Sequence, residues 1–530
     1  MSDPSLLVAD RQRILLAFRG EPIRRLTHLS RWQGSALLIV GTAIVSLMHV
    51  LAQDAASAPS GPDPGNWLRL AWSLTGQGVE STTPYPPVLP ALLRTELMVL
   101  QPMVAVKVLG LLAAVLMVVP CYLLLRKRIA AWSAACLALA AIVAGYQQEV
   151  YAWGGYTQLL ATGFLLFAVY WLGCWLETGS RSQLVLSAVF VSLTAGTSHF
   201  VLAQFAAVSV VTVVVLMLTS PDRSRMGRKL TVWALACGAA SLVFLPWYTE
   251  IVSTMASATT NASSFSMLSF SSYEFVFREN LGLGLGYAVV GAAASVSPIG
   301  GPNTRALRPL VIGLIWGPFI VFALTGEIRH FQLIQVGLIL SLSFLVSEAE
   351  NGVKELRFAK PGLQGLLRMA PATLVGAFLV SVALTGHNRL EDATAWYRTI
   401  DVPGQAALDF IRSETPEDAI VFAGTSTRGL PYGWWVEGYA RRQTFHHVDQ
   451  NLLLFKTERE LAGLADRLTS ATTGPGEFAE LLSESGISYV LLTPDSTEFE
   501  AFLRRVSTSE VFRNGGYRVL RIEALNGSRQ

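Results

Sequence analysis

The sequence predicts a polytopic α-helical membrane protein, with about 11 transmembrane helices followed by a small extracytoplasmic α/β domain. Of its 530 residues, 52% are hydrophobic and only 15% are charged, and the mean hydropathy is +0.45. A soluble globular protein of this length would carry more charge. The charge is also uneven, because residues 387–530 hold 15 of the 40 Lys and Arg but 20 of the 37 Asp and Glu. These features indicate an apolar body and a separate, slightly acidic tail.

Apolar runs are the third observation behind this fold class. Eleven of them are long enough to cross a hydrocarbon core about 30 Å thick. They lie near residues 35–53, 101–125, 129–146, 156–176, 183–198, 200–219, 230–248, 281–298, 309–325, 331–347 and 370–386. We therefore expect a multi-pass protein of the cell (inner or plasma) membrane.

Basic residues give the orientation. They gather before the first run and on alternate connections, for example "RKR" at 126–128 and "RSRMGRK" at 223–229. The excess of Lys and Arg on cytoplasmic loops then predicts a cytoplasmic amino terminus. An odd number of spans places the carboxy-terminal domain on the other side of the membrane.

The expected organisation has four parts. Residues 1–34 form a basic cytoplasmic segment, and residues 35–386 form the transmembrane domain, whose first outer loop covers 54–100. Residues 387–402 are a linker, and residues 403–530 form the α/β domain. In that domain, helical patterns such as "ERELAGLADRLTS" alternate with strand patterns such as "ISYVLLTP".

Several function classes find no support in the sequence. The four cysteines all fall in predicted spans, and no Cys or His spacing is typical of a metal site. No glycine motif of a nucleotide-binding loop is found, and we expect no nucleic-acid partner.

The first outer loop carries an acid at an unusual place. Asp63 precedes "PGNWLRLAWSL", whose apolar residues recur at helical spacing and predict an interfacial helix. Asp63 stands where a helix N-cap belongs, so capping is one interpretation. The segment "YPPVLPALL" at 85–93 predicts a rigid turn that holds the loop against the membrane surface.

These residues together resemble a known family. The acid in the first outer loop, the interfacial helix, the Tyr-Pro-Pro segment, "WGGYTQLLA" at 153–161 and the exported α/β domain resemble the GT-C superfamily of integral-membrane glycosyltransferases. The resemblance implies transfer of a hexose or pentose, with inversion, from a polyprenyl-phosphate-linked sugar to a glycan or glycolipid acceptor. Besides these substrates, the expected partners are membrane lipids, and the process is cell-envelope polysaccharide biosynthesis.

The resemblance implies roles for two carboxylates. Asp63 is the candidate general base, because an acceptor hydroxyl must lose a proton as it attacks the anomeric carbon. Asp54 is the competing carboxylate, with a swapped or shared role left open. The two stand nine residues apart, which is not the tight Asp-x-Asp pair of metal-dependent members, so a divalent metal remains an open question.

The leaving phosphate requires positive charge at membrane depth. Arg329 and His330 in "EIRHFQ" are the candidates for phosphate binding, with an interface anchor as the alternative for Arg329. The remaining candidates for substrate binding on the membrane side are Tyr85, Glu149, Trp153, Tyr156 and His199. Glu149 could equally serve a metal, the aromatic residues could form an interfacial belt, and His199 could be a helix-end histidine.

Further substrate-binding candidates come from looser resemblances to oligosaccharyltransferases. Glu274 lies in the Ser/Thr-rich loop 249–280, which resembles a flexible substrate loop or is a plain connector. The stretch "YGWWVEGYARRQTFHHVDQN" resembles the sequence after their WWDYG motif, and its Trp434, Trp435 and Glu437 form a possible surface facing the cavity at membrane level. Its Trp-Trp-Asp half is absent here, which disfavours a peptide acceptor. Packing of the domain onto the body is the alternative for these residues.

Two other functions remain as alternatives. A lipid-linked-sugar flippase or transporter would also have many spans, but the sequence shows neither internal repeat nor mid-span acids. The other is transfer of a glycan to protein by an oligosaccharyltransferase-like enzyme.

Overall fold

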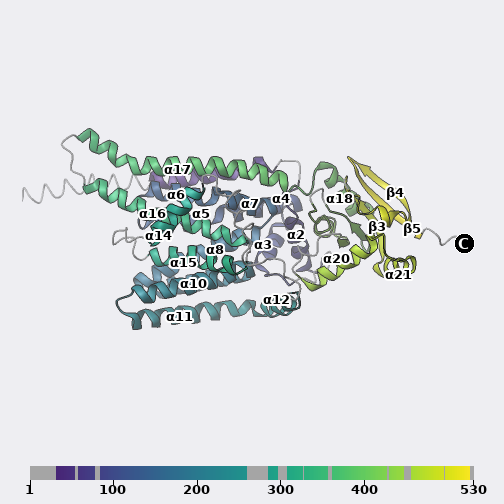
Figure 1. Ribbon diagram of the computed structural model, residues 1–530, viewed down its shortest axis with the longest axis horizontal. Helices are drawn as coiled ribbons and strands as arrows, with labels where there is room; N and C mark the ends of the chain where they lie inside the picture. Colours follow the sequence, from purple (N-terminus) through teal and green to yellow (C-terminus); the bar gives the residue numbers. More distant parts are fainter. Residues whose placement is uncertain are drawn as a thin grey trace, which may run out of the picture.

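The protein is built from a long helical body and a smaller α/β part at its carboxy-terminal end (Figure 1). The computed structural model describes residues 32–53, 58–77, 84–258, 284–296, 307–325, 328–355, 361–425, 429–446, 455–494 and 496–525. In Figure 1 the long helices lie roughly side by side along the longest axis, and α2 and α3 lie between them and the α/β part.

The helical body follows the apolar runs of the sequence. Its α-helices are Trp32–Ala52, α4 (Pro102–Leu116), α5 (Val118–Arg126), α6 (Ala131–Val143), α7 (Gly145–Trp153), α8 (Tyr156–Thr178), α9 (Arg181–Thr197), α10 (His199–Thr219), α11 (Arg223–Ser241), α12 (Leu245–Ala258), α14 (Gly284–Val296), α15 (Leu307–Thr325), α16 (Phe331–Glu355) and α17 (Pro361–Trp396). Two 3-10 turns, η1 (Leu242–Phe244) and η4 (Ile328–His330), precede α12 and α16.

Eight helices in the described part of the chain are long and apolar enough to cross a membrane. Each of the eleven predicted runs contains a helix in its described residues, but α6 and α14 have 13 residues each and α9 has 17. A helix needs about 17 residues or more to cross the hydrocarbon core, and a tilted helix needs more. The polytopic helical fold is therefore confirmed, whereas the number of spans stays a prediction.

The α/β part contains one mixed five-stranded sheet of order β2-β1-β3-β5-β4. Its strands are β1 (Ile420–Ala423), β2 (Gln443–His446), β3 (Ile487–Leu492), β4 (Val506–Asn514) and β5 (Tyr517–Leu525). Its helices are α18 (Val402–Glu414), α19 (Gly433–Trp435), the π-helix η5 (Val436–Ala440), α20 (Lys456–Thr469), α21 (Pro475–Ser485) and α22 (Glu500–Leu503). Strand β1 pairs in parallel with β2 and β3, and β5 pairs antiparallel with β3 and β4.

The first outer loop forms two short helices, α2 (Asp63–Ser73) and α3 (Val88–Glu96). The sequence predicts α2 as a helix in the headgroup plane, but the structure buries nearly all of it, with Trp67 and Trp72 only 3% and 5% exposed. The Trp72 indole N–H donates to the Gly438 carbonyl of η5 at 3.0 Å. Helix α2 is therefore an internal layer that joins the body to the α/β part.

A buried ion pair strengthens this junction. The Arg69 guanidinium of α2 lies 3.1 Å from the Glu437 carboxylate and 3.2 Å from that of Glu458. Asn66 accepts from the same guanidinium at 2.7 Å, and Thr444 donates to Glu437 at 2.9 Å. Buried charges persist only when they are paired in this way.

Replacing Arg69 with Met should therefore lower the free energy of unfolding by about 3–5 kcal/mol, because two buried carboxylates lose their cation. Thermal unfolding in detergent measures this as a lower Tm. Arg467→Met is the matched control, since it removes an ion pair with Glu477 whose side chains are 52% and 47% exposed and should cost about 1 kcal/mol at most. Equal Tm values for the two variants would contradict the buried-pair argument.

Candidate active site

A cavity of about 150 Å³ lies where the helical body, α2 and the α/β part meet. Parts of the chain that lie far apart in sequence supply its walls. The lining residues are Asp63, Asn66, Trp67, Tyr85, Trp153, Gly155, Thr157, Gln158, Ser198, His199, Phe200, Arg329, Trp434, Phe455 and Glu458. Five of the residues predicted for the site therefore line one cavity together: Asp63, Tyr85, Trp153, His199 and Arg329.

Asp63 is the first residue of α2, and Pro62 takes the N-cap position. The capping interpretation is therefore wrong for Asp63, because it is helical itself. Burial raises the pKa of the Asp63 carboxyl from 3.8 to about 7, and the nearby Arg329 guanidinium opposes this rise. A carboxyl group with a pKa near neutral pH is suited to taking up and releasing a proton.

Two glycines, Gly61 and Gly154, allow the segment around Asp63 to approach the "WGG" turn at the end of α7. Gly154 has φ +91°, a left-handed conformation that favours glycine. A Cβ atom there would lie 2.3 Å from Cδ of Pro64 and 3.1 Å from Cβ of Asp63. The Trp67 indole N–H donates to the Gly154 carbonyl at 2.8 Å. The position of Asp63 is thus fixed by close backbone packing.

Replacing Gly154 with Ala should lower the free energy of unfolding by more than the left-handed backbone alone would cost, which is about 1–2 kcal/mol. The control is Gly179→Ala, because Gly179 also has a positive φ, +75°, but a Cβ there meets nothing within 4 Å. Thermal unfolding of both variants measures the difference. A Gly154 variant as stable as the Gly179 variant would show that the contact with Pro64 is relieved without cost.

Aromatic rings and one cation form the opposite wall. Tyr85 stands between Trp67 and His199, with ring centroids 4.9 and 5.5 Å away. Its hydroxyl lies 3.3 Å from that of Thr157. The Arg329 guanidinium lies over the Phe200 ring at 5.1 Å. This part of the lining offers the apolar faces of aromatic rings and one positive charge. That charge acts on the Asp63 carboxyl.

Three predicted site residues on the membrane side lie behind the wall. His330 stacks on Phe200 at 4.5 Å, and its Nδ1 lies 3.0 Å from the Gln204 amide nitrogen. Tyr156 is fully buried beside Tyr151. Glu149 is 9% exposed. None of the three is among the residues that line the cavity, so their roles as site residues stay predictions.

The α/β part contributes a wall that matches the sequence prediction only in part. Trp435 and Glu437 are buried, Trp435 donating to the Gly61 carbonyl at 3.1 Å and Glu437 pairing with Arg69. Their alternative interpretation, packing of the domain, agrees with these contacts. Trp434, which the sequence places on the same surface, lines the cavity together with Phe455 and Glu458.

Several lining residues were not predicted from the sequence as site residues: Asn66, Thr157, Gln158, Ser198, Phe200, Phe455 and Glu458. The sequence carries one signal for four of these residues. Asn66, Thr157, Gln158 and Ser198 lie close in sequence to residues that were predicted for the site. Phe455 and Glu458 had no such signal.

Some predictions cannot be placed. Asp54 and Glu274 lie outside the described residues. Within the described ranges, no group of three or more His, Cys, Asp and Glu is arranged to hold a metal ion. Asp63 and Glu458 are the acidic side chains among the described lining, and Glu458 already binds Arg69.

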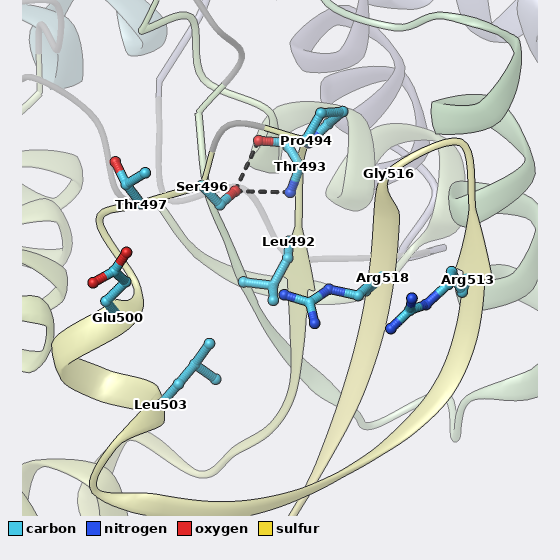
Figure 2. A pocket seen from close by; sticks show the side chains of 10 residues that line it. All are labelled: Leu492, Thr493, Pro494, Ser496, Thr497, Glu500, Leu503, Arg513, Gly516 and Arg518. Atoms are coloured by element: carbon cyan, nitrogen blue, oxygen red, sulfur yellow. Dashed lines mark hydrogen bonds between the residues drawn. The ribbon is translucent and has the colours of Figure 1, made fainter.

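A second cavity, of about 410 Å³, lies entirely within the α/β part, beside the end of β3 and the β4–β5 hairpin. Figure 2 shows that Arg513 and Arg518 project from the hairpin, whereas the Ser496 hydroxyl is hydrogen-bonded to Thr493 just after β3. Arg513 is bound to Glu510 at 2.7 Å, and Glu500 to Arg504 at 3.2 Å. This second cavity shares no lining residue with the Asp63 cavity, and none of its lining residues was predicted as a site residue.

A multi-span helical body, two short helices in the described part of the first outer loop and an α/β part at the carboxy-terminal end make up a fold that is also found in solved structures. The chain superposes on an oligosaccharyltransferase from Archaeoglobus fulgidus in the apo form with a TM-score of 0.56 and 13% identity, over 91% of this chain and 73% of that one. It matches ArnT from Cupriavidus metallidurans bound to undecaprenyl phosphate with a TM-score of 0.56 and 13% identity, over 91% and 97%.

A third similar structure is AglB from Archaeoglobus fulgidus in complex with an inhibitory peptide and a dolichol-phosphate. Its TM-score is 0.54 at 14% identity, over 94% of this chain and 75% of that one. No protein-family model matches the chain, and no curated protein matches its sequence. The predicted resemblance is thus confirmed at the level of the fold.

Proposed function

We propose that this protein is a membrane glycosyltransferase that moves a sugar from a polyprenyl-phosphate carrier to a cell-envelope glycan or glycolipid on the outer face. The observation that carries the proposal is that Asp63 and Arg329 line one cavity, where the Arg329 charge acts on the Asp63 carboxyl. A carboxylate and a guanidinium in one cavity match the two demands of the reaction, a proton acceptor and a partner for the leaving phosphate.

In the proposed reaction, the Asp63 carboxylate takes the proton of the acceptor hydroxyl. The hydroxyl oxygen bonds to the anomeric carbon as the bond from that carbon to the phosphate oxygen breaks. The electron pair of the broken bond leaves with the polyprenyl phosphate, whose charge Arg329 stabilises. Attack opposite to the leaving group inverts the anomeric centre.

The similar structures support a lipid carrier. ArnT was solved with undecaprenyl phosphate and AglB with a dolichol-phosphate, which are both polyprenyl phosphates. Here, the cavity lies at the end of the helical body, next to the domain proposed to be outside the cell. The proposed orientation, with a cytoplasmic amino terminus in the inner or plasma membrane, presents the anomeric carbon of such a donor at headgroup level.

The function is tested by deleting the gene in the native host and comparing envelope glycans and glycolipids by mass spectrometry. We expect one species to lose a single sugar. Purified protein in detergent should restore that sugar when supplied with the polyprenyl-phosphate-sugar pool and the truncated species from the deletion strain. Unchanged glycans in the deletion strain would contradict the proposal.

The same experiment separates the alternatives. Loss of a flippase would alter the glycan in cells. A purified flippase would transfer no sugar in detergent, because it only moves lipids between the two sides of a membrane. If the protein transfers glycan to protein, the deletion strain should contain a polypeptide that lacks its glycan. One of the similar oligosaccharyltransferase structures was solved tethered to an acceptor peptide.

A further inference from the structure

Glu149 is held by two partners behind the cavity. Its carboxylate lies 2.6 Å from the guanidinium of Arg389 on α17, and it accepts a hydrogen bond of 2.8 Å from the Tyr397 hydroxyl. Arg389 balances its charge, so the carboxylate has a fixed orientation. Glu149 therefore joins α7 to the end of α17, and Tyr397 is the residue that follows this helix.

Tyr397 in turn holds the chain just before Asp63. The Tyr397 carbonyl accepts from the Gly61 N–H at 2.8 Å. The Gly61 carbonyl accepts from the Trp435 indole N–H at 3.1 Å. Both polar backbone groups of Gly61 are therefore fixed, two residues before the carboxylate.

Packing leaves the Gly61 segment no room to shift. Gly61 has φ +90°, and a Cβ there would lie 2.1 Å from the Trp153 carbonyl oxygen. The Trp153 ring lines the cavity and packs edge-on against the Tyr397 ring, with centroids 6.3 Å apart. Tyr397 thus contacts both the wall of the cavity and the segment that carries Asp63.

We propose that Glu149 and Tyr397 are positioning residues for Asp63. Glu149 fixes the Tyr397 hydroxyl, the ring orientation fixes the Tyr397 carbonyl, and this carbonyl fixes Gly61 and the direction of the Asp63 carboxylate. The inference rests on the proposed function, because positioning matters when a base must meet an acceptor hydroxyl within hydrogen-bonding distance. It gives Glu149 a role that requires contact with neither substrate nor metal.

The test uses Tyr397→Phe, which keeps the ring and the backbone carbonyl but removes the bond to Glu149. The rate followed is that of the sugar transfer that Asp63→Asn is expected to reduce. We expect Tyr397→Phe to lower this rate about 10-fold to 100-fold, since small misplacements of reacting groups have effects of this size. Affinity for undecaprenyl phosphate should change by less than about twofold, because Arg329 is unaffected.

Tyr439→Phe is the matched control. Its hydroxyl also donates to a carboxylate, that of Asp409 at 2.6 Å, but Tyr439 does not line the cavity, so its transfer rate should stay normal. Glu149→Gln keeps an acceptor for Tyr397 and should retain most of the rate, whereas Glu149→Ala should match Tyr397→Phe. The double variant Tyr397→Phe with Glu149→Ala should be no slower than either single variant, because the residues act in one chain of contacts.

Hydrogen exchange gives a second readout that does not depend on activity. The Gly61 amide should exchange faster in Tyr397→Phe than in the unaltered protein or in Tyr439→Phe. A normal transfer rate and normal Gly61 exchange in Tyr397→Phe would overturn the inference while leaving the proposed function intact. A parallel loss of undecaprenyl phosphate affinity would also overturn it. Normal transfer in Asp63→Asn would instead remove the proposed function.

Discussion

Replacing Asp63 with Asn should reduce sugar transfer by about 10²–10⁴-fold, the usual contribution of a general base. The amide keeps the size of the side chain and its place at the start of α2, but it cannot accept the proton of the acceptor hydroxyl. The rate is measured with purified protein in detergent and the donor pool of the deletion strain. Affinity for undecaprenyl phosphate should stay near its normal value.

The pH dependence of transfer should report the same carboxyl group. Burial raises the pKa of Asp63 to about 7, so below pH 7 the group is protonated and cannot act as a base. The rate should therefore fall as the pH decreases through about 7 and level off above it. A rate independent of pH between 5 and 9 would contradict Asp63 as the base.

The stability of the folded protein should fall as the pH rises, whereas the transfer rate should increase. The folded protein keeps a proton on Asp63 up to pH about 7, whereas the unfolded chain releases it near the ordinary value of 3.8. The unfolded state thus binds fewer protons between these values, and the folded state loses stability as the pH rises from about 4 to 7. Asp63→Asn removes this cost and should raise the free energy of unfolding at pH 8 by at most about 4 kcal/mol, which is measured as a higher Tm, with little effect at pH 4.

Three further variants make the assignment specific. Asp392→Asn alters an exposed carboxylate of α17 outside the cavity and should leave transfer unchanged. Glu458→Gln alters the other described carboxylate of the lining and should retain proton transfer, although it weakens the contact with Arg69. A complete loss in Glu458→Gln or Asp54→Asn, with normal transfer in Asp63→Asn, would move the base to that residue.

The sequence was most informative where structure depends on local patterns. Each apolar run forms a helix, because a lipid environment requires long apolar segments with internally satisfied backbone groups. The helical spacing of Trp67, Leu68 and Ala71 correctly predicted α2. It could not reveal that the apolar face would be covered by protein, since lipid and protein interiors select the same side chains.

Adjacent residues in the site separate for a geometric reason. Arg329 and His330 lie in one 3-10 turn, where successive side chains point about 120° apart. One therefore lines the cavity and the other packs against Phe200 and Gln204. A motif of two neighbouring residues cannot specify which of them faces the substrate until the turn type is known.

The wall from the α/β part depends on contacts that no local pattern encodes. Arg69 and Glu458 are 389 positions apart in sequence, yet their side chains meet at 3.2 Å. Trp434 and Trp435 are neighbours of the same type, and only the docking of η5 on α2 decides that Trp434 reaches the cavity while Trp435 binds Gly61. Such long-range pairing arises from the packing of the whole chain.

Replacing Arg329 with Gln should weaken binding of undecaprenyl phosphate by about 10-fold to 100-fold, the value of a charge-assisted hydrogen bond of about 1.5–3 kcal/mol. It should also move the pH midpoint of transfer above 7, because the Arg329 charge lowers the pKa of Asp63. Arg329→Lys keeps the charge but loses the planar fork, so it should bind with intermediate affinity and keep a midpoint near 7.

The control for this change of charge is Arg181→Gln, at the exposed start of α9 and outside the cavity. Unaltered binding together with an unaltered midpoint in Arg329→Gln would show that this guanidinium faces neither phosphate nor base. The two effects test one geometry, because a cation that attracts the leaving phosphate must also favour the charged form of a carboxylate in the same cavity. A shifted midpoint with normal phosphate binding would keep Arg329 beside Asp63 but assign the phosphate to another cation.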